Sequence, residues 1–600
     1  MPTESFFSSA SLAYIASAGA GKDGKTYSIK PTDGSGDFTF SRGSNLAATR
    51  VGPTGLIEKG RENLLTYSNV FGQGYPHWAT SGVNTPTSGQ SGYDGSSDAW
   101  LLERNAADGF LYAVTAESGV NTFSVYAKAN TADFVALREV NGYGMVYFDL
   151  SNGTIGTSTG GNVFAKSIDS VGNGWYRCSI HISGATLSQV RIHPTTQNGS
   201  TSGTSGSIYI QDAQLEIGLA ATDYIESGAT TGKAGLLEDE PRFDYSGGAT
   251  CPSLLLEPSK TNLASSEYFD QYWASNSTKV YNQITSPEGV QNGTKIYPNA
   301  TGSFRGISKT FGSSLSNTPY TLSIFAKASE FEYLAFYNIG SPDGNNGVWF
   351  NLTTGSVGTN QAAWTSAKME DYGNGWYRCS AVVTPGGSSD NIYILLSDLN
   401  GLVTATTNGT DGLYIYGAQL EAGPYPTSYI PNHSGGSVTR GEDECTGAGD
   451  AAAFNDSEGV FYAEISTNTD DTDKAVSINN SMSGGSNSRL WMGYSTTAKR
   501  VYTLGYVNNS VQFVLSKLMT DESAFVKIAC KYALNDVSFF VNGEKVGTDT
   551  SALEFIGLNS LDFNIGTGSG GSAFFYGKAK QVLYFPTALS DADCITLTTL

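Results

Sequence analysis

The chain has 600 residues, enough for several hydrophobic cores and therefore for more than one domain. It contains 72 glycines, 12% aromatic residues and only 15% charged residues, a composition that favours many short strands joined by tight turns over long helices. The formal net charge of −21 would repel nucleic-acid phosphates, so we expect no nucleic-acid partner. No run of 18 apolar residues occurs, which predicts no insertion into a membrane.

The first residues and the cysteines indicate where the protein is made. Glu4 precedes the mildly apolar N-terminal stretch and no base does, whereas a secretory signal carries basic residues at that place. We therefore expect synthesis in the cytoplasm without a signal peptide. Six cysteines, with no C-x-x-C and no Cys/His cluster, predict neither a disulfide framework nor a zinc site.

The stretch GAGKDGKT at 19–26 matches the phosphate-binding loop pattern G-x-x-x-x-G-K-[ST]. Such a loop needs a helix directly after its Lys-Thr, because the helix N-terminus holds the phosphates. Here the chain continues as YSIKPTDGSGDFTFS, which alternates like a strand and places Pro31 where a helix would be broken. We interpret the match as a hairpin loop between the strands LAYIAS and TYSIKP, and we expect no cofactor.

A repeat covers most of the chain. Three segments recur at nearly constant separation: NTFSVYAKA (121–129) as YTLSIFAKA (320–328), GNGWYRCS (172–179) unchanged at 373–380, and IYIQDAQLEIG (208–218) as LYIYGAQLEAG (413–423). The separation drifts only from 199 residues, between Asn63 and Asn262, to 205, between Leu215 and Leu420, as loop insertions between fixed strands would produce.

The repeat sets the expected domain organisation. We predict copy 1 at 61–235 and copy 2 at 261–440, joined by a connecting segment at 236–260. A short β segment at 1–60 precedes them, and a non-repeating domain at 441–600 follows.

The repeated blocks alternate like strands. In GWYRCSIHI, Cys178 shares a face with apolar residues, and Trp175 and Arg177 share the other face. We expect Cys178 and its counterpart Cys379 in equivalent cores, and Arg177 stacked on Trp175 as a structural pair. Turn signals such as SNGT and GNG separate the strands. The expected fold class is all-β, with tandem antiparallel β-sandwiches of jelly-roll type and little helix.

The last domain, 441–600, is also rich in strands. VNGEKVG at 541–547 has the Asn-Gly pair of a tight hairpin. Only SDADCITLTTL at 590–600 reads as a helix, with Ser590 as N-cap and Asp593 three residues later.

Several phrases resemble known families. The copy 1 phrases NLLTYSNVF, NTFSVYAKA, GWYRCS and IYIQDAQLEIG resemble the jelly-roll carbohydrate-binding modules of families four, nine and twenty-two. LYIYGAQLEAGPYPTSYIPN at 413–432 resembles a closing phrase of tailed-bacteriophage structural proteins, and the segments 36–58 and 241–263 are similar to their connecting segments. VKIACKYALNDVSFFVNGEKVG at 526–547 is similar to the concanavalin A/laminin G lectin-like sandwich. The resemblance implies glycan-binding sandwiches carried on a virion.

Metal binding is not expected. The resembled binding modules often hold calcium with an Asp-rich closing strand, but this chain has Gln211-Asp212 in copy 1 and Tyr416-Gly417 in copy 2. The loop NTDDTDKA (468–475) groups Asp470, Asp471 and Asp473. It could bind Ca²⁺, but a solvated acidic turn is the preferred interpretation because no complete ligand pattern is present.

Carbohydrate binding is predicted at four aromatic residues, because sugars stack on aromatic faces. Trp78 and Trp273 follow the first strand of each copy, and Tyr147 and Trp349 occupy one equivalent strand position. In the alternative interpretation, Trp78 and Trp273 plug the ends of their own sandwiches, and Tyr147 and Trp349 have a purely structural place.

No catalytic residues are predicted. The chain has four histidines, no H-E-x-x-H and no G-x-S-x-G, although a pair of catalytic carboxylates would leave no trace in the sequence. We expect a non-enzymatic, virion-associated phage protein, a tail fibre or surface decoration, that binds host cell-surface glycan and docks to other virion proteins through its N-terminal segment. A purely architectural decoration or spacer and a polysaccharide depolymerase are the alternatives. Oligomeric state is open.

Overall fold

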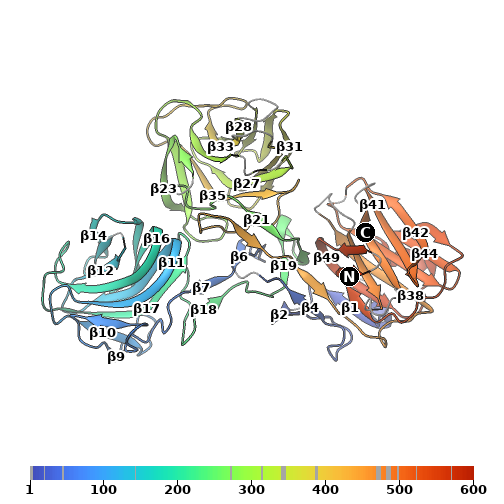
Figure 1. The fold of residues 1–600 in the computed structure, drawn as a ribbon, viewed down its shortest axis with the longest axis horizontal. Helices are drawn as coiled ribbons and strands as arrows, with labels where there is room; N and C mark the ends of the chain where they lie inside the picture. Colours follow the sequence, from blue (N-terminus) through green and yellow to red (C-terminus); the bar gives the residue numbers. More distant parts are fainter. Residues whose placement is uncertain are drawn as a thin grey trace.

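The computed structural model describes residues 4–18, 21–43, 46–141, 144–270, 273–312, 315, 317–339, 346–385, 390–467, 474–480, 488–495, 499–521, 523–568 and 571–600. The all-β fold predicted from the sequence is confirmed: the sheets are antiparallel, and within these ranges the only α-helices are α1 (Glu4–Ser9) and α2 (Asp591–Thr598). None of the described helices is long and apolar enough to cross a membrane. The chain forms three lobes around a centre of short strands (Figure 1).

Copy 1 forms the lobe on the left of Figure 1. Its strands are β8 (Ala79–Ser81), β9 (Thr87–Gln90), β10 (Ala99–Glu103), β11 (Phe110–Ala129), β12 (Phe134–Glu139), β13 (Met145–Asp149), β14 (Thr154–Thr159), β15 (Val163–Gly172), β16 (Trp175–Thr195) and β17 (Ser207–Ile217). The long strands β11 and β16 each take part in both layers of the sandwich: the first half of β11 pairs with β8 and with the end of β16, and its second half pairs with β17 and with the start of β16.

Copy 2, at the top of Figure 1, has the same layout with those long strands divided into separate ones. One sheet has the order β22-β26-β33-β28-β29-β30, made of Ala274–Ser275, Gly306–Gly312, Asp390–Ser397, Tyr333–Ile339, Asn346–Asn351 and Ser356–Asn360. The other has the order β23-β24-β35-β27-β32-β31, made of Ser277–Ile284, Gly293–Pro298, Leu413–Ala422, Tyr320–Ala328, Trp376–Val383 and Trp364–Asp371. A two-stranded ladder, β25 (Gly302–Ser303) with β34 (Thr404–Ala405), lies apart from both sheets.

The repeated sequence blocks occupy matching registers. Val125 lies opposite Cys178 in copy 1, and Ile324 lies opposite Cys379 in copy 2. Both cysteines are fully buried in the cores of their sandwiches, as the alternation predicted. A register slip of one residue would turn these faces outward, so the burial of the alternating apolar residues fixes the pairing.

The closing phrase of each repeat works as an internal clamp. In copy 1 the Glu216 carboxylate accepts hydrogen bonds from the Thr222 backbone N–H (2.9 Å) and hydroxyl (2.6 Å), and from Gln214 Nε2 (2.7 Å). In copy 2 the Glu421 carboxylate binds Thr427 and Gln419 in the same way. All these groups are buried, so the Q-x-E…T pattern ties the last strand to the segment that leaves the sandwich.

A repeated asparagine joins the start of each copy to this clamp. Asn63 Nδ2 donates to the carbonyls of Ala213 (3.1 Å) and Ile225 (2.9 Å). Asn262 Nδ2 makes the matching bonds to the carbonyls of Ala418 and Ile430. Each copy is entered and left through a short ladder: β7 (Arg61–Asn63) pairs with β18 (Gly232–Ala234), and β21 (Lys260–Asn262) pairs with β36 (Val438–Arg440).

The C-terminal sandwich forms the lobe on the right of Figure 1. Its second sheet contains β39 (Lys474–Asn479), β40 (Arg489–Ser495), β41 (Arg500–Val507), β42 (Ser510–Leu518) and β46 (Ser560–Asp562), and β47 (Asn564–Gly568) pairs with β48 (Gly571–Phe574) beside it. Its first sheet contains β38 (Glu458–Ser466), β43 (Val526–Ala533), β44 (Asp536–Val541), β45 (Glu544–Asp549), β49 (Gly577–Phe585), and three strands from outside 441–600: β1 (Leu12–Ile15), β19 (Arg242–Asp244) and β20 (Ser253–Leu256).

The N-terminal segment is therefore built into the C-terminal sandwich. Strand β1 pairs with β49, and both Leu12 and Tyr14 are fully buried in the core. The segment continues as β4 (Phe38–Ser41), paired with β37 (Glu444–Thr446), and as β5 (Thr49–Val51) paired with β6 (Ile57–Lys59). The chain termini lie in the same lobe (Figure 1).

A buried ion network joins three segments: the one before copy 1, which contains Arg42, the one between the copies, which contains Arg242 and Glu257, and the one at the end of copy 2, which contains Arg440 and Asp443. Asp443 forms ion pairs with Arg42 (3.2 Å) and with Arg242, and Glu257 forms ion pairs with Arg242 (2.7 Å) and Arg440 (2.9 Å). All five side chains are almost completely buried, so each charge depends on its partners for the solvation that it has lost. The network therefore holds these three segments together at the centre of the molecule.

The hairpin predicted at 19–26 is present, but the strands that flank it differ from the predicted pair. Strands β2 (Gly21–Lys22) and β3 (Lys25–Thr26) form a tight hairpin with Asp23 and Gly24 at positive φ. LAYIAS contributes the separate strand β1, residues 27–29 of TYSIKP are not in a strand, and no helix follows Lys25 and Thr26. The other local turn signals are confirmed. Asn542 and Gly543 likewise turn β44 into β45. In α2 the Ser590 hydroxyl accepts from the Asp593 N–H at 3.2 Å, which is the expected N-cap.

Candidate functional site

The structure places Trp78 and Trp273 inside their sandwiches. Their exposed fractions are 1% and 5%, and each indole packs against a phenylalanine, Phe71 or Phe269. The Trp78 Nε1–H donates to the Tyr67 carbonyl at 3.0 Å, and Trp273 makes the equivalent bond to a backbone carbonyl. Neither ring has an open face on which a sugar could stack. This is the packing expected if each tryptophan fills the end of its own sandwich.

Tyr147 and Trp349 lie on the outer face of an equivalent sheet, away from the main core. Tyr147 packs with Ala136 and Met145, and Trp349 packs with Ala335 and Leu395. Both rings are nevertheless buried, with exposed fractions of 3% and 1%. They form the floor of this face rather than its surface.

Half-buried residues lie above this floor in copy 2. Tyr337 on β28 is directly opposite Tyr393 on β33, and the Phe304 ring lies 5.5 Å from Tyr337 and 5.8 Å from Tyr393. The Trp349 Nε1–H donates to the Leu402 carbonyl at 2.6 Å, which anchors a loop beside the cluster. Sequence reasoning missed Tyr337 and Tyr393, although they lie two residues from Ala335 and Leu395 on strands with period two.

The expected stacking of Arg177 on Trp175 is wrong. Arg177 lies over the ring of Tyr126, its direct cross-strand neighbour, with 5.3 Å from Cζ to the ring centroid. In copy 2 Arg378 lies over Phe325 at 5.5 Å. Adjacent strands bring side chains closer than positions two apart on one strand, which are separated by about 6.6 Å along the chain.

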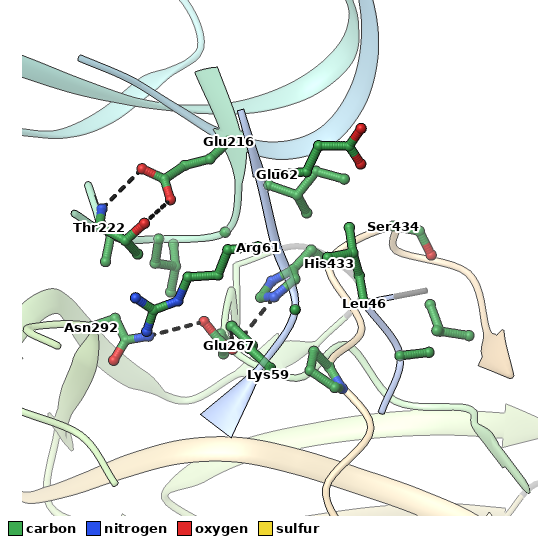
Figure 2. Close-up of a pocket in the computed structure, with 18 of the residues that line it drawn as sticks. Leu46, Lys59, Arg61, Glu62, Glu216, Thr222, Glu267, Asn292, His433 and Ser434 are labelled. Carbon is green, nitrogen blue, oxygen red and sulfur yellow. Dashed lines mark hydrogen bonds and ion pairs between the residues drawn. The ribbon is translucent and has the colours of Figure 1, made fainter. Parts of the chain in front are cut away.

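A cavity of about 340 Å³ lies where copy 1, copy 2 and the N-terminal segment meet (Figure 2). Its wall includes Lys59 and Arg61 from the N-terminal segment and the start of copy 1, Glu216 from copy 1, and Glu267 and His433 from copy 2. It was not predicted, because its residues come from segments hundreds of positions apart.

The charges at the base of this cavity are paired. Lys59 Nζ lies 2.6 Å from Glu288 Oε1 and 3.8 Å from Glu267 Oε1, and His433 Nε2 lies 3.5 Å from Glu267 Oε1. Burial alone would raise the pKa of Glu288, but Lys59 outweighs it and the pKa is lowered. Burial lowers the pKa of His433, so its ring is neutral near pH 7.

The carboxyls on the other wall of the cavity are more easily protonated. Burial, and then the neighbouring charge of Glu62, raises the pKa of Glu117. Burial also raises the pKa of Glu216, although its hydrogen bonds to Thr222 oppose this. Glu267 and Glu288 both lie near Lys59, and the lowered pKa of Glu288 keeps its carboxylate charged beside that ammonium. The arrangement suits a structural ion cluster.

No group of three or more His, Cys, Asp or Glu side chains suitable for a metal ion occurs among the described residues. Asp470, Asp471 and Asp473 lie outside the described residues. Asp212, in the closing strand of copy 1, is instead bonded by the Tyr93 hydroxyl at 2.9 Å.

Comparisons with known proteins bear on the last domain. Residues 456–594 match the family model described as the concanavalin A-like lectin/glucanases superfamily. The lectin-like sandwich predicted for the C-terminal end is thereby confirmed. No curated protein matches the chain.

Several solved structures are similar to part of the chain. The CBM40 module of the Ruminococcus gnavus IT-sialidase, in its complex with α2,3-sialyllactose, is 18% identical with a TM-score of 0.22, over 25% of this chain and 86% of that one. Its complex with α2,6-sialyllactose is 17% identical, with the same TM-score and coverage. The leech intramolecular trans-sialidase, complexed with 2,7-anhydro-Neu5Ac, is 20% identical with a TM-score of 0.21, over 24% of each chain. The family-model match to residues 456–594, by itself, identifies a concanavalin A-like sandwich at the C-terminal end of the chain.

Proposed function

We propose that this protein binds glycans through its β-sandwiches and acts as a virion-associated structural protein of a tailed phage, a tail fibre or surface decoration. The observation that carries the binding role is the match of residues 456–594 to a lectin-containing family. The virion role rests on the resemblance of the repeat and connector phrases to phage structural proteins. The protein would be made in the host cytoplasm and act without catalysis.

The outer face of copy 2 supports glycan binding outside the lectin-like domain. Tyr337, Tyr393 and Phe304 are half-buried, so part of each ring reaches solvent while the other part is fixed by neighbours. Rings held in this way lose little freedom when a sugar stacks on them. This face is the proposed site for an uncharged sugar ring.

The arrangement of the lobes suits display on a particle. The N-terminal segment belongs to the C-terminal lobe, so docking through this segment would place that lobe next to the virion. Copies 1 and 2 would then extend outward. Weak sites on several modules and several copies of the protein would add up to strong adhesion through multivalency.

A purely architectural role is the second candidate. It is favoured by the burial of Trp78, Trp273, Tyr147 and Trp349, which leaves none of the four predicted aromatic rings open. The buried network around Asp443 would give such a spacer its stiffness.

A glycan array probed with the full-length protein separates the two candidates. We expect binding to a subset of bacterial surface glycans and neutral oligosaccharides, with sialyllactose included as a probe. Tyr337→Ala combined with Tyr393→Ala should weaken one class of signal by about tenfold or more, equivalent to about 1.4 kcal/mol.

Tyr414→Ala is the matched control. It removes a half-buried tyrosine from the other sheet of copy 2 and should leave the array unchanged. No signal from folded protein on any glycan, and no inhibition of phage adsorption to host cells, would instead support the architectural role.

A further inference from the structure

Two arginines occupy the face of copy 1 that is aromatic in copy 2. Arg138 on β12 lies directly opposite Arg191 on β16, and Tyr337 lies opposite Tyr393 at the matching place in copy 2. The correspondence is supported by the next pair on the same face of the sheet, because Ala136 lies opposite His193 in copy 1 as Ala335 lies opposite Leu395 in copy 2. Like charges directly opposite each other destabilise a sheet, so this pair costs folding free energy.

A third arginine and a buried histidine add to this group. Burial first, and then Arg138, Arg104 and Arg191, lower the pKa of His193 to about 3. The ring is therefore neutral, and it is almost completely buried in the middle of three cations. No described side chain makes a hydrogen bond to its ring nitrogens, and Ala136, which lies opposite His193, packs against Tyr147 on its other side.

Among the described residues, the hydrogen bonds that Arg191 and Arg104 donate go to uncharged groups. The Arg191 guanidinium donates to Gln189 Oε1 at 2.9 and 3.1 Å and lies 4.1 Å above the Phe110 ring. Arg104 donates to two backbone carbonyls. Across the described residues, neither Arg104 nor Arg191 forms an ion pair with a carboxylate, although acids outnumber bases by 55 to 34 in the chain.

The neighbours of the arginines suit a sugar ring. Tyr112 lies directly opposite Arg191 on its other side, and the Phe110 ring is 5.6 Å from that of Tyr112. The side chains of Arg191, Tyr112 and Phe110 are all half-buried, so their neighbours hold them in place while part of each reaches solvent. A guanidinium binds a carboxylate through two parallel hydrogen bonds, and an adjacent aromatic ring can stack on the C–H face of the sugar that carries it.

We infer that this face of copy 1, formed by the half-buried Arg138, Arg191, Tyr112 and Phe110, with the buried Arg104 adding positive charge nearby, is a binding site for acidic sugars that bear a carboxylate. The inference rests on the proposed glycan-binding function and names the ligand class of one module. The two copies then have the same scaffold with divided specificity: copy 1 binds charged sugars and copy 2 binds uncharged ones.

The test uses the full-length protein and three immobilised probes: oligogalacturonate, the same oligomer with its carboxyl groups reduced to alcohols, and a phosphorylated mannan. We expect binding to oligogalacturonate, at least tenfold weaker binding to the reduced oligomer, and loss of binding as NaCl is raised from about 50 to 500 mM, because salt screens the charges. Stronger binding to the phosphorylated mannan than to oligogalacturonate would overturn the assignment to carboxylates.

The variant pair is Arg138→Gln with Arg191→Gln, and its matched control is Tyr337→Gln with Tyr393→Gln at the equivalent positions of copy 2. The arginine variant should lose at least tenfold in affinity for oligogalacturonate, and its thermal unfolding should confirm that it is folded at the temperature of the binding assay. The tyrosine variant should bind oligogalacturonate normally. Binding that survives the arginine variant would overturn the site.

The two proposals fail in distinguishable ways. If the protein binds neutral glycans on the array but not oligogalacturonate, only the acidic-sugar site is wrong. If it binds no glycan of either class, the proposed glycan-binding function fails with it.

Discussion

Arg42 and Asp443 are 401 positions apart in the sequence, yet their side chains form a fully buried ion pair of 3.2 Å. Asp443 also pairs with Arg242, from the segment between the two copies, and accepts the Glu257 backbone N–H at 2.9 Å. One carboxylate therefore joins the segment before copy 1, the segment between the copies and the segment after copy 2. The lobes are held in a fixed arrangement from this centre.

Replacing this carboxylate should destabilise the whole molecule. Asp443→Asn keeps the size of the side chain but leaves Arg42 and Arg242 without their shared anion in a buried site. Breaking a buried ion pair from one side costs about 3–5 kcal/mol. We expect a clear fall in the midpoint of thermal unfolding, measured by calorimetry.

Glu444→Gln is the control for this prediction. Glu444 is the next residue along the chain and is exposed, so its change should alter stability by less than about 0.5 kcal/mol. Equal melting of the two variants would show that the network contributes nothing to stability.

The N-terminal strand should be required for the stability of the C-terminal sandwich. Tyr14 is fully buried between Phe38 and Phe563, and its hydroxyl lies 3.2 Å from Thr26 Oγ1. Tyr14→Ala should cost about 3–5 kcal/mol, because a large aromatic side chain leaves a cavity.

The milder change Tyr14→Phe removes only the hydroxyl and should cost about 1 kcal/mol. Limited proteolysis of both variants, monitored by mass spectrometry, should show earlier cleavage within residues 441–600 for Tyr14→Ala alone. Unchanged protection of that region would mean that β1 is dispensable.

Trp78→Ala and Trp273→Ala should affect folding more than binding. Both indoles are buried and hydrogen-bonded, so each truncation should destabilise its own copy by about 3–5 kcal/mol. Differential scanning calorimetry should show one lowered transition for each variant. Glycan binding measured well below that transition should be retained, and its specific loss from a fully folded variant would restore the sugar-platform interpretation.

Asp212 should make stability depend on pH. Burial, and then the charges of Asp98 and Asp94, raise its pKa from 3.8 to about 7, against the opposing hydrogen bond from Tyr93. The folded protein holds a proton that the unfolded chain releases, so the free energy of unfolding falls as pH rises from about 4 to 7.

Asp212→Asn stays neutral and can keep the positive φ of this position. The stability of this variant relative to the wild type should therefore grow across that pH window, by at most about 4 kcal/mol at about 1.4 kcal/mol per pKa unit. Chemical denaturation at pH 4, 5.5 and 7 measures it. Asp223→Asn, at an exposed neighbour, is the control and should follow the wild type at each pH.

Local patterns in the sequence were sufficient to predict many of the strands and turns and to recognise the repeat. The alternation around Cys178 and Cys379 identified the core face of a strand because side chains on a strand alternate between its two faces. The Asn542-Gly543 turn and the Ser590 cap were equally visible, since their geometry depends on a few adjacent residues.

The candidate sites were less accessible from the sequence. The alternation of side chains along a strand placed Tyr147 and Trp349 at equivalent positions on one face of a sheet. Such alternation cannot show that a neighbouring loop packs against the ring, as the loop of Leu402 does beside Trp349. Arg138 and Arg191 come from strands that are not adjacent in the sequence, so their pairing depends on strand order and register.

The sequence by itself determined that the chain is all-β, that it contains one domain twice, and that a different sandwich follows, because these properties depend on periodicity and on local turn chemistry. Only the tertiary structure decided that β1 completes the C-terminal sandwich, that Arg42, Arg242 and Arg440 share two buried carboxylates, and that one copy presents arginines where the other presents tyrosines. Contacts of this kind join segments that are not adjacent in the sequence, and they form only when the packing of the cores has brought those segments together.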